Sequence, residues 1–314
     1  MTGIVTSPAK LSSHLDEGLV AVERAMLEVT DSQVEVLRDA SRHILSAGGK
    51  RIRPRLLLLT YLALGGGDVT YVAKPAAAIE LMHTASVVHD DINDHGILRR
   101  GRPSVNAIWG RTFALLTGDF LFTAVYELMA PYQHLNIDLA RAATALVEGE
   151  TLQASAVKNN TFTREVYMDI IALKTASLFR AAAVIGAKLA KADQGKINAL
   201  AEFGYNVGLA FQIIDDILDI VADEESLGKT SGIDVRQGRG VAVALAPNGN
   251  GNAQVIDPVE AIKRKMMEGD TIDKARAQAT LLVNSAIAKL RELPESSAKS
   301  ALEELALMVI ERET

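Results

Sequence analysis

Two acidic runs, each at the end of an apolar segment, constrain the fold of this chain more than any other feature. The first reads DDIND and starts at Asp90, and the second reads DDILD and starts at Asp215. On a helix, residues i and i+4 lie on one face a turn apart, so Asp90 should point with Asp94 and Asp215 with Asp219. Carboxylates on two core-facing helices repel one another unless cations lie between them. A helical bundle can meet this requirement by bringing both runs to one central cavity.

The composition and the hydrophobic periodicity favour an all-α fold. The chain has 314 residues, is rich in Ala and Leu, and contains only 4% aromatic residues and 8 prolines, which favours helix over strand. Apolar residues recur at helical spacing between short polar or glycine-containing breaks. We expect one all-α domain over residues 1–314, a large helical bundle with a central cavity. The expected breaks lie at 48–49, at 65–68, at 101–103, near Pro131, at 158–160 and at 222–234.

Individual residues predict two of the helix ends. Asp31 or Ser32 can cap a helix that stops at Gly48-Gly49. Pro294 suits the first turn of a last helix. The apolar face of that last helix is formed by Leu302, Leu305 and Val309.

Bulk properties exclude several classes of protein. The net charge of −6 and the pI near 5.6 argue against a nucleic-acid binder with a broad basic face. Without cysteine there is no disulfide and no Cys-ligated metal. The N-terminal segment lacks the pattern of a secretion signal, and the densest apolar run, 56–64, is too short to span a bilayer. We expect a cytoplasmic protein without a transmembrane segment.

The acidic runs are candidates for a magnesium site. Carboxylate oxygens are hard ligands that suit Mg²⁺, which commonly bridges one or two carboxylates to substrate phosphates. A single DDxxD run is more often a solvated helix face, but two runs that both follow core-facing segments favour metal binding. The candidate ligands are Asp90, Asp91, Asp94, Asp215, Asp216 and Asp219.

Basic residues near the expected helix ends supply the opposite charge. In GGKRIRP two glycines, whose backbone N–H groups can turn toward an anion, precede Lys50, Arg51 and Arg53. Each cation alone is more often a surface residue, but beside two magnesium-type faces they indicate a site for two phosphorylated substrates, one held through metal and one by Lys and Arg. The other candidate cations are Arg99, Arg100, Lys174, Lys229 and Arg239.

The histidines do not form a zinc site. His83, His89 and His95 are spaced by six residues, which turns each about 240° from the last, so they cannot share one helical face. His89 beside Asp90 is similar to the dyad of metal phosphohydrolases, but the second acidic run has no place in that scheme. We interpret His89 as structural and expect that His83 can reach the cavity.

Eight collinear segments resemble the motifs of the trans-type isoprenyl diphosphate synthases, the polyprenyl synthetase family. They extend from about Gly48 to Gly238 and read GGKRIRP, ELMHTASVVHDDIND, RRGRP, GDFLF, EGETLQ, KTASLF, FQIIDDILD and GKTSGID. The resemblance implies an isoprenoid synthase fold and a prenyltransferase of isoprenoid biosynthesis that condenses isopentenyl diphosphate with an allylic diphosphate. It also implies Mg²⁺ as cofactor and a homodimer.

The family pattern assigns roles to the matching residues. The six aspartates would bind the Mg²⁺ that holds the allylic diphosphate and, with Lys174, would form the catalytic set. Isopentenyl diphosphate would be bound by Lys50, Arg53, His83 and Arg100. The allylic diphosphate would be contacted by Arg99, Lys174, Thr175, Gln212, Lys229 and Arg239.

The residues before the first acidic run bear on product length. In the family, bulky aromatics about one turn before the first aspartate stop the product at fifteen carbons, whereas Ala85 and Ser86 here are small. The next candidates for the cavity floor are Met82 and Ile79, the latter about 16 Å below the run. We expect an all-trans product of twenty carbons or more and favour a long polyprenyl chain.

Three other interpretations compete with this one. The chain could be a geranylgeranyl or farnesyl diphosphate synthase. A terpene cyclase would pair DDxxD with an Asn/Ser/Glu motif, which DDILD does not match. A non-catalytic subunit of a hetero-oligomeric synthase would be expected to lose aspartates or the GGKR cations, and both are present. The chain departs from the family after GKTSGIDVRQGR, where Arg239 replaces a common lysine and a segment expected to be a surface loop, 246–258, follows.

Overall fold

The computed structural model describes residues 7–159, 161–221 and 270–312. Nearly all regular structure in these ranges is helical, which confirms the all-α prediction. The helices are α1 (Pro8–Val29), α2 (Glu35–Ser46), α3 (Ile52–Ala63), α4 (Ala73–Asn93), α5 (Val105–Met129), α6 (Asn136–Asn159), α7 (Arg164–Ile171), α8 (Ser177–Leu189), α9 (Gln194–Val221), α14 (Thr271–Lys289) and α15 (Ser297–Ile310). Shorter elements are the strands β1 (Leu98–Arg99) and β2 (Arg102–Pro103), the 3-10 turns η1 (Ala130–Leu135) and η3 (Leu290–Glu292), and the π-helical turn η2 (Ala172–Ala176).

Helix α3 lies at the centre of the bundle. Its sequence, IRPRLLLLTYLA, is apolar around most of the helix circumference, so other helices must cover it on several sides. It packs against α4 and α8 and also touches α1 and α15. A Cβ on Gly186 of α8 would lie 2.6 Å from the Leu57 carbonyl oxygen, so the glycine allows these two central helices to pack closely.

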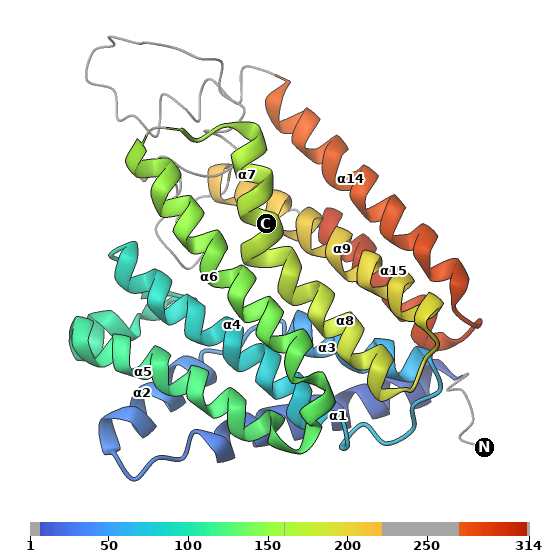
Figure 1. Cartoon of the computed structure of the whole chain (residues 1–314), viewed down its shortest axis with the longest axis horizontal. Coiled ribbons are helices and arrows are strands. Elements are labelled where there is room, and N and C mark those ends of the chain that lie inside the picture. The colour runs from blue at the N-terminus through green and yellow to red at the C-terminus, as the bar shows by residue number, and fades with distance from the viewer. Residues whose placement is uncertain (1–6, 160, 222–269, 313–314) are drawn as a thin grey trace.

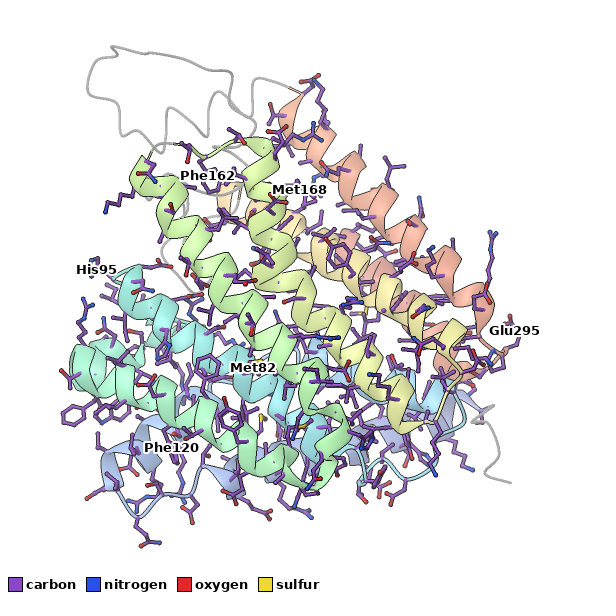
Figure 2. The ribbon with its side chains drawn as sticks, in the orientation of Figure 1. Met82, His95, Phe120, Phe162, Met168 and Glu295 are labelled. Carbon is purple, nitrogen blue, oxygen red and sulfur yellow. The ribbon has the colours of Figure 1, made fainter. Side chains whose placement is uncertain are left out.

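The longer helices run side by side around this centre (Figure 1). Helix α9 packs against α8 and α14, and α4 packs against α5. Figure 2 shows Met82 of α4 within the bundle and Glu295 at its edge, in agreement with exposed fractions of 3% for the Met82 residue and 88% for the Glu295 side chain. The two helices that carry the acidic runs, α4 and α9, therefore both contribute side chains to the same hydrophobic core.

The expected break at 101–103 is a β-hairpin. Strands β1 and β2 pair antiparallel, with Arg99 opposite Arg102. The two residues between them, Arg100 and Gly101, have φ of 52° and 72°, and a two-residue hairpin loop favours such positive values. The hairpin therefore presents Arg99 and Arg100 just after the end of α4.

The predicted N-cap of the helix before Gly48 is wrong for both candidate residues, Asp31 and Ser32. Helix α2 has Val34 as its N-cap. Asp31 instead pairs with Arg42 at 2.9 Å, and the Ser32 hydroxyl accepts from the Val34 N–H. Neither side chain therefore caps the first turn of α2.

The predicted place of Pro294 in the first turn of the last helix is also wrong, because α15 begins later, at Ser297. Its N-cap is Ser296, whose hydroxyl accepts from the Lys299 N–H at 3.1 Å. The predicted apolar face of this helix is buried, formed by Leu302, Leu305 and Val309.

Two helical stretches, 105–159 and 164–189, are long and apolar enough to cross a membrane by length and composition alone. The apolar window of the second is 72% buried, as expected of a core helix, whereas that of the first is 44% buried. The first stretch, which comprises α5 and α6, therefore leaves apolar surface exposed.

Candidate active site

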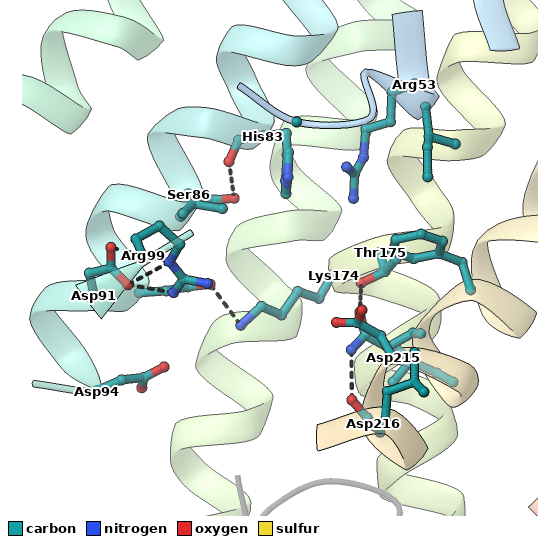
Figure 3. Close-up of a pocket in the computed structure, with 18 of the residues that line it drawn as sticks. Arg53, His83, Ser86, Asp91, Asp94, Arg99, Lys174, Thr175, Asp215 and Asp216 are labelled. Atoms are coloured by element: carbon teal, nitrogen blue, oxygen red, sulfur yellow. Dashed lines mark hydrogen bonds and ion pairs between the residues drawn. The ribbon is translucent and has the colours of Figure 1, made fainter. Parts of the chain in front are cut away.

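A cavity of about 610 Å³ is formed where the helices meet. Its walls come from the start of α3, from α4, the hairpin, α7, η2 and α9, and from Arg312 after α15. Figure 3 shows the α4 run and the α9 run on opposite sides of this pocket, with Lys174 extended between them. The fold thus brings together segments that are far apart in the sequence, as the two runs predicted.

The first acidic run ends α4. Asp94 is the C-cap, and its N–H donates to the Asp90 carbonyl oxygen at 2.8 Å. The Asp91 side chain is 2% exposed and accepts from Nε and Nη2 of Arg99, with Nε at 3.1 Å. Burial raises the pKa of Asp91, and the Arg99 hydrogen bonds act against this rise. Asp90 Oδ2 lies 3.2 Å from Lys174 Nζ, so two protein cations neutralise much of this run.

In the second run, Asp216 belongs to a hydrogen-bond network with neutral groups. The Tyr167 hydroxyl donates to Asp216 Oδ2, and Gln212 Nε2 donates to Asp216 Oδ1, both at 2.8 Å. The Thr175 hydroxyl in turn donates to Gln212 Oε1 at 2.8 Å. Both carboxylate oxygens of this buried aspartate therefore hold neighbouring side chains in place.

The other two aspartates of this run differ in exposure. Asp215 lines the cavity, has a side chain that is 39% exposed, and lies 3.7 Å from Arg312 Nη1. The Arg312 guanidinium also lies 5.1 Å from the ring centre of Phe211. Asp219 is 1% exposed and does not line the cavity. Asp215 is therefore the member of DDILD best placed to meet a ligand.

The lining carboxylates suit a hard divalent cation that arrives with further ligands. Asp90, Asp94 and Asp215 all line the cavity. Within the described residues, no three acidic or histidine side chains converge closely enough to hold an ion alone. Phosphate oxygens and water can complete the coordination of such an ion, so the donor set fits a metal that binds together with a phosphorylated substrate.

The segment GGKRIRP links α2 to α3 through an unusual backbone. Gly48 and Gly49 have φ of 72° and 140°, and Arg51, the N-cap of α3, is left-handed with φ of 47°. A Cβ on Gly49 would lie 2.7 Å from Arg100 Nη1. The φ of 140° disfavours any other residue at position 49, and the absence of a side chain lets the Arg100 guanidinium lie against this segment.

The residues predicted to bind isopentenyl diphosphate all line the cavity, and Arg53 and His83 lie next to each other at one edge of it (Figure 3); the four are Lys50, Arg53, His83 and Arg100. Arg53 is 8% exposed, its guanidinium lies 4.8 Å from the ring centre of Phe179, and its Nε has no hydrogen-bond partner in the described part of the chain. Burial lowers the pKa of Arg53 to about 10, so it stays charged at neutral pH. A buried cation with an unused donor is suited to an anion.

His83 is neutral at neutral pH. Burial, followed by the charges of Arg53 and Arg100, lowers the pKa of His83 well below its usual value. Burial, followed by Arg312, also lowers the pKa of Lys50. This end of the cavity is therefore strongly electropositive even without a charged histidine.

Lys174 lies in the π-helical turn η2. Its Nζ contacts Glu150 Oε1 at 2.5 Å as well as Asp90. A Cβ on Gly149 would lie 2.8 Å from the Lys174 backbone nitrogen, so the glycine of EGETLQ makes room for the turn. Burial and the charge of Asp90 raise the pKa of Glu150 to about 7, against the effect of Lys174. π-turns often occur at functional sites, and this one directs Lys174 toward the first acidic run.

Comparison with known proteins agrees with this geometry. The family model described as polyprenyl synthetase matches residues 34–281. The chain is 38% identical to the short chain isoprenyl diphosphate synthase of Methanothermobacter thermautotrophicus, with 94% of this chain and 96% of that one covered. The chain belongs to the polyprenyl synthetase family. It is a polyprenyl diphosphate synthase, a prenyltransferase.

This polyprenyl synthetase has the isoprenoid synthase fold. The crystal structure of the polyprenyl synthase from Caulobacter crescentus, complexed with calcium and isoprenyl diphosphate, matches it with a TM-score of 0.91 at 33% identity, over 98% of this chain and 99% of that one. The octaprenyl diphosphate synthase of Escherichia coli is 33% identical over 97% and 98% of the two chains. Enzymes of this family use divalent cations, and their members differ in product length.

Of the predicted floor residues, only one lines the cavity of this polyprenyl synthetase. Ser86 does so, and its hydroxyl donates to the His83 carbonyl oxygen at 2.8 Å. The other three are buried and lie outside the cavity lining: Ala85, Met82 and Ile79. The role of these residues in product length stays a prediction.

His89 lies outside the cavity lining, in agreement with its interpretation as structural. Its Nε2 lies 3.2 Å from the Leu115 carbonyl oxygen and 3.5 Å from Asp119. A Cβ on Gly118 would lie 2.2 Å from the same nitrogen, so the glycine of GDFLF provides the space for this ring.

Sequence reasoning missed several side chains that line the polyprenyl synthetase cavity. Glu80 and Gln153 lie within the matching motifs, where a polar residue among apolar neighbours was a usable signal. Tyr167 and Arg312 lie in no motif, and only the fold brings them to the site. Two predicted residues lie outside the described ranges: Lys229 and Arg239.

Proposed function

We propose that the enzyme condenses isopentenyl diphosphate with an allylic diphosphate, in the presence of Mg²⁺, to give an all-trans polyprenyl diphosphate of twenty carbons or more. The observation that carries the proposal is the division of charge in one cavity. Carboxylates of both runs lie on two sides of the cavity, while Arg53 and His83 lie at a third edge of it (Figure 3). Two diphosphates can bind such a cavity, one through metal and one directly.

The residues around the first run are suited to hold the allylic diphosphate. Lys174 and Arg99 lie beside the carboxylates of this run, where their charge can stabilise the diphosphate as the allylic C–O bond breaks. Mg²⁺ held by Asp90, Asp94 and Asp215 would add to this stabilisation of negative charge. The departing diphosphate can then take the proton that is lost after the isopentenyl double bond has attacked.

Apolar side chains line the part of the cavity where a carbocation would form. They are Val87, Phe162, Ile170, Ile171, Phe211 and Leu218. Exclusion of water by such a surface protects the allyl cation from quenching, and aromatic faces can also stabilise a cation.

Product length is proposed from the small residues before the first run. Ser86 lines the cavity and Ala85 precedes it on α4, so no aromatic ring at these positions blocks a growing chain. We favour a long polyprenyl product, while a geranylgeranyl synthase remains the shorter form of the same proposal.

The test is to size the products of the purified enzyme. It is incubated with Mg²⁺, labelled isopentenyl diphosphate and dimethylallyl, geranyl, farnesyl or geranylgeranyl diphosphate. We expect products of twenty carbons or more from wild type, and products of fifteen carbons or fewer from the double variant Ala85→Phe/Ser86→Phe. Ser86→Ala is the matched control, because it keeps the position small and should leave product length unchanged. An unchanged product length in the double variant would show that residues other than Ala85 and Ser86 form the floor of the cavity.

We also propose a homodimer that buries the outer faces of α5 and α6. Phe113, Leu116 and Tyr126 of α5 and Val147 of α6 are exposed, Tyr126 by 77% and Val147 by 58%. Monomeric proteins rarely leave large apolar patches exposed. Light scattering after gel filtration should give a dimer, and Tyr126→Glu with Val147→Glu should give a monomer. A monomeric wild type would contradict this proposal.

Two further expectations are part of the same proposal, a single domain over residues 1–314 and a cytoplasmic location. Limited proteolysis should yield no pair of independently folded fragments. Cell fractionation should recover the enzyme with soluble proteins.

A further inference from the structure

A carboxylate lies behind the cations of the proposed isopentenyl diphosphate site. Glu80 of α4 is 3% exposed and lines the cavity. A buried carboxylate is costly unless a cation pairs with it. Its partner is Arg51, whose Nη1 lies 3.1 Å from Glu80 Oε1 and which is itself 8% exposed.

The Arg51 guanidinium is occupied by protein acceptors. Besides Glu80, it donates from Nη2 to the Leu45 carbonyl oxygen at 2.9 Å, and its Nε lies 3.5 Å from Glu23 Oε1. These contacts join the end of α2, α1 and α4 to one side chain. The Arg51 side chain therefore stabilises the backbone around it through these contacts, and its guanidinium is not free to act as the main ligand of a diphosphate.

The backbone that Arg51 braces carries the ligand-binding cations. Lys50 and Arg53 lie on either side of it, and Arg51 has a left-handed φ of 47° as the N-cap of α3. A left-handed arginine is strained and persists only where surrounding contacts hold it. The two buried contacts of its guanidinium, with Glu80 and with the Leu45 carbonyl oxygen, can supply this restraint, and the Glu80 contact is the charged one.

Glu80 also acts on the neighbouring arginines through its charge. Burial lowers the pKa of Arg53 and of Arg100, and in both cases Glu80 is the strongest influence in the opposite direction. One carboxylate thus limits the mutual repulsion of three arginines around the electropositive end of the cavity.

We propose that Glu80 is a positioning residue for isopentenyl diphosphate, which acts by anchoring Arg51 and so fixing the segment that carries Lys50 and Arg53. The inference rests on the proposed function of this end of the cavity. Glu80 does not touch the allylic diphosphate region around Lys174, so its effect should fall on one substrate.

The test separates the two substrates kinetically. Glu80→Gln should raise KM for isopentenyl diphosphate about tenfold and leave KM for the allylic starter within about twofold. Glu23→Gln is the matched control, because this acid contacts the same arginine from a side chain that is 55% exposed, and it should change neither KM. An equal rise in both KM values, or no rise, would overturn the inference.

A double-variant cycle tests whether Glu80 acts through Arg51. Arg51→Gln alone should show the same selective rise in KM, and the double variant Glu80→Gln/Arg51→Gln should be no worse than the poorer single variant. Additive increases in KM would contradict the inference that Glu80 acts through Arg51. If Glu80→Gln fails to fold, Glu80→Asp, which keeps the charge but shortens the reach, should show a smaller rise in the same KM.

The outcome also distinguishes this inference from the proposed function. A wild-type enzyme that elongates no starter defeats the proposed function itself. A wild-type enzyme that elongates, combined with an unselective Glu80→Gln, defeats only the positioning role.

Discussion

The two acidic runs share one sequence pattern but have different surroundings. In DDIND the middle aspartate, Asp91, is paired with a cation, Arg99, and the first, Asp90, lies beside Lys174. In DDILD the middle aspartate, Asp216, accepts instead from the neutral groups of Tyr167 and Gln212. The described contacts thus pair the first run with two protein cations, whereas those of Asp216 are hydrogen bonds from neutral side chains.

This difference shows what a repeated motif does and does not determine. The spacing DDxxD places the first carboxylate of each run at the cavity wall. The balancing charge comes from elsewhere, because Arg99 lies on the hairpin and Lys174 lies in η2. Among the described contacts, the cation beside the first aspartate of the second run, Arg312, lies 3.7 Å from Asp215, which is farther than Lys174 lies from Asp90 at 3.2 Å.

The largest expected effect comes from removing the cavity-lining carboxylate of either run. Asp90→Ala and Asp215→Ala should each lower turnover by roughly 1,000-fold or more, because both runs are proposed to hold the same metal. Circular dichroism should show that the helical content is unchanged. Turnover within about tenfold of wild type in either variant would contradict the proposal that both runs hold the same metal.

A smaller effect is expected from the middle aspartate of the second run. Asp216→Asn keeps the shape but leaves one of the donors, Tyr167 or Gln212, without its acceptor, so turnover should fall roughly 10- to 100-fold. Tyr167→Phe removes one donor and keeps the charge, and it should cost less. Single-turnover kinetics checks both, and a loss as large as that of Asp215→Ala would assign Asp216 to the metal.

The pairing of the first run is tested by Arg99→Lys. Lysine keeps the charge but cannot make the two hydrogen bonds to Asp91, so KM for the allylic starter should rise about tenfold while KM for isopentenyl diphosphate stays unchanged. Steady-state kinetics with each substrate varied in turn measures this. A rise in KM for isopentenyl diphosphate would contradict the assignment of Arg99 to the allylic diphosphate.

The smallest expected effect is on stability and comes from His83, which belongs to neither acidic run. Its pKa is lowered by burial and by Arg53, so the unfolded chain binds a proton that the native protein does not. Stability should be complete above the unfolded value of about 6.5 and should fall as pH drops below it. His83→Gln should make this fall shallower in thermal unfolding between about pH 7.5 and 5. An equally steep fall would assign the pH dependence to other groups.

The sequence predicted the fold class and the general location of the site. Helical periodicity and two spaced aspartate runs sufficed for an all-α bundle with one charged cavity, because both signals are local in the chain. The basic set around Lys50 and Arg53 was also found, since glycines and arginines cluster there within a few residues.

What the sequence could not predict depends on contacts between distant segments. Six aspartates looked equivalent, yet Asp219 is 1% exposed and Asp215 lines the cavity. Nothing near Arg312 in the sequence indicates that it lies beside Asp215, and Arg51 gave no sign that it braces the chain through Glu80. The cap prediction failed for Asp31 and for Ser32 because a polar side chain near a helix start can bond to other partners.

The central claim, that both runs hold one metal–diphosphate complex, is tested most directly by calorimetric binding of a non-reactive allylic diphosphate analogue with and without Mg²⁺. We predict that wild type binds the analogue tightly only with Mg²⁺, and that Asp90→Ala and Asp215→Ala each remove this dependence. Mg²⁺-dependent binding of wild-type affinity by Asp215→Ala would contradict the account, because the second run would then hold no part of the complex.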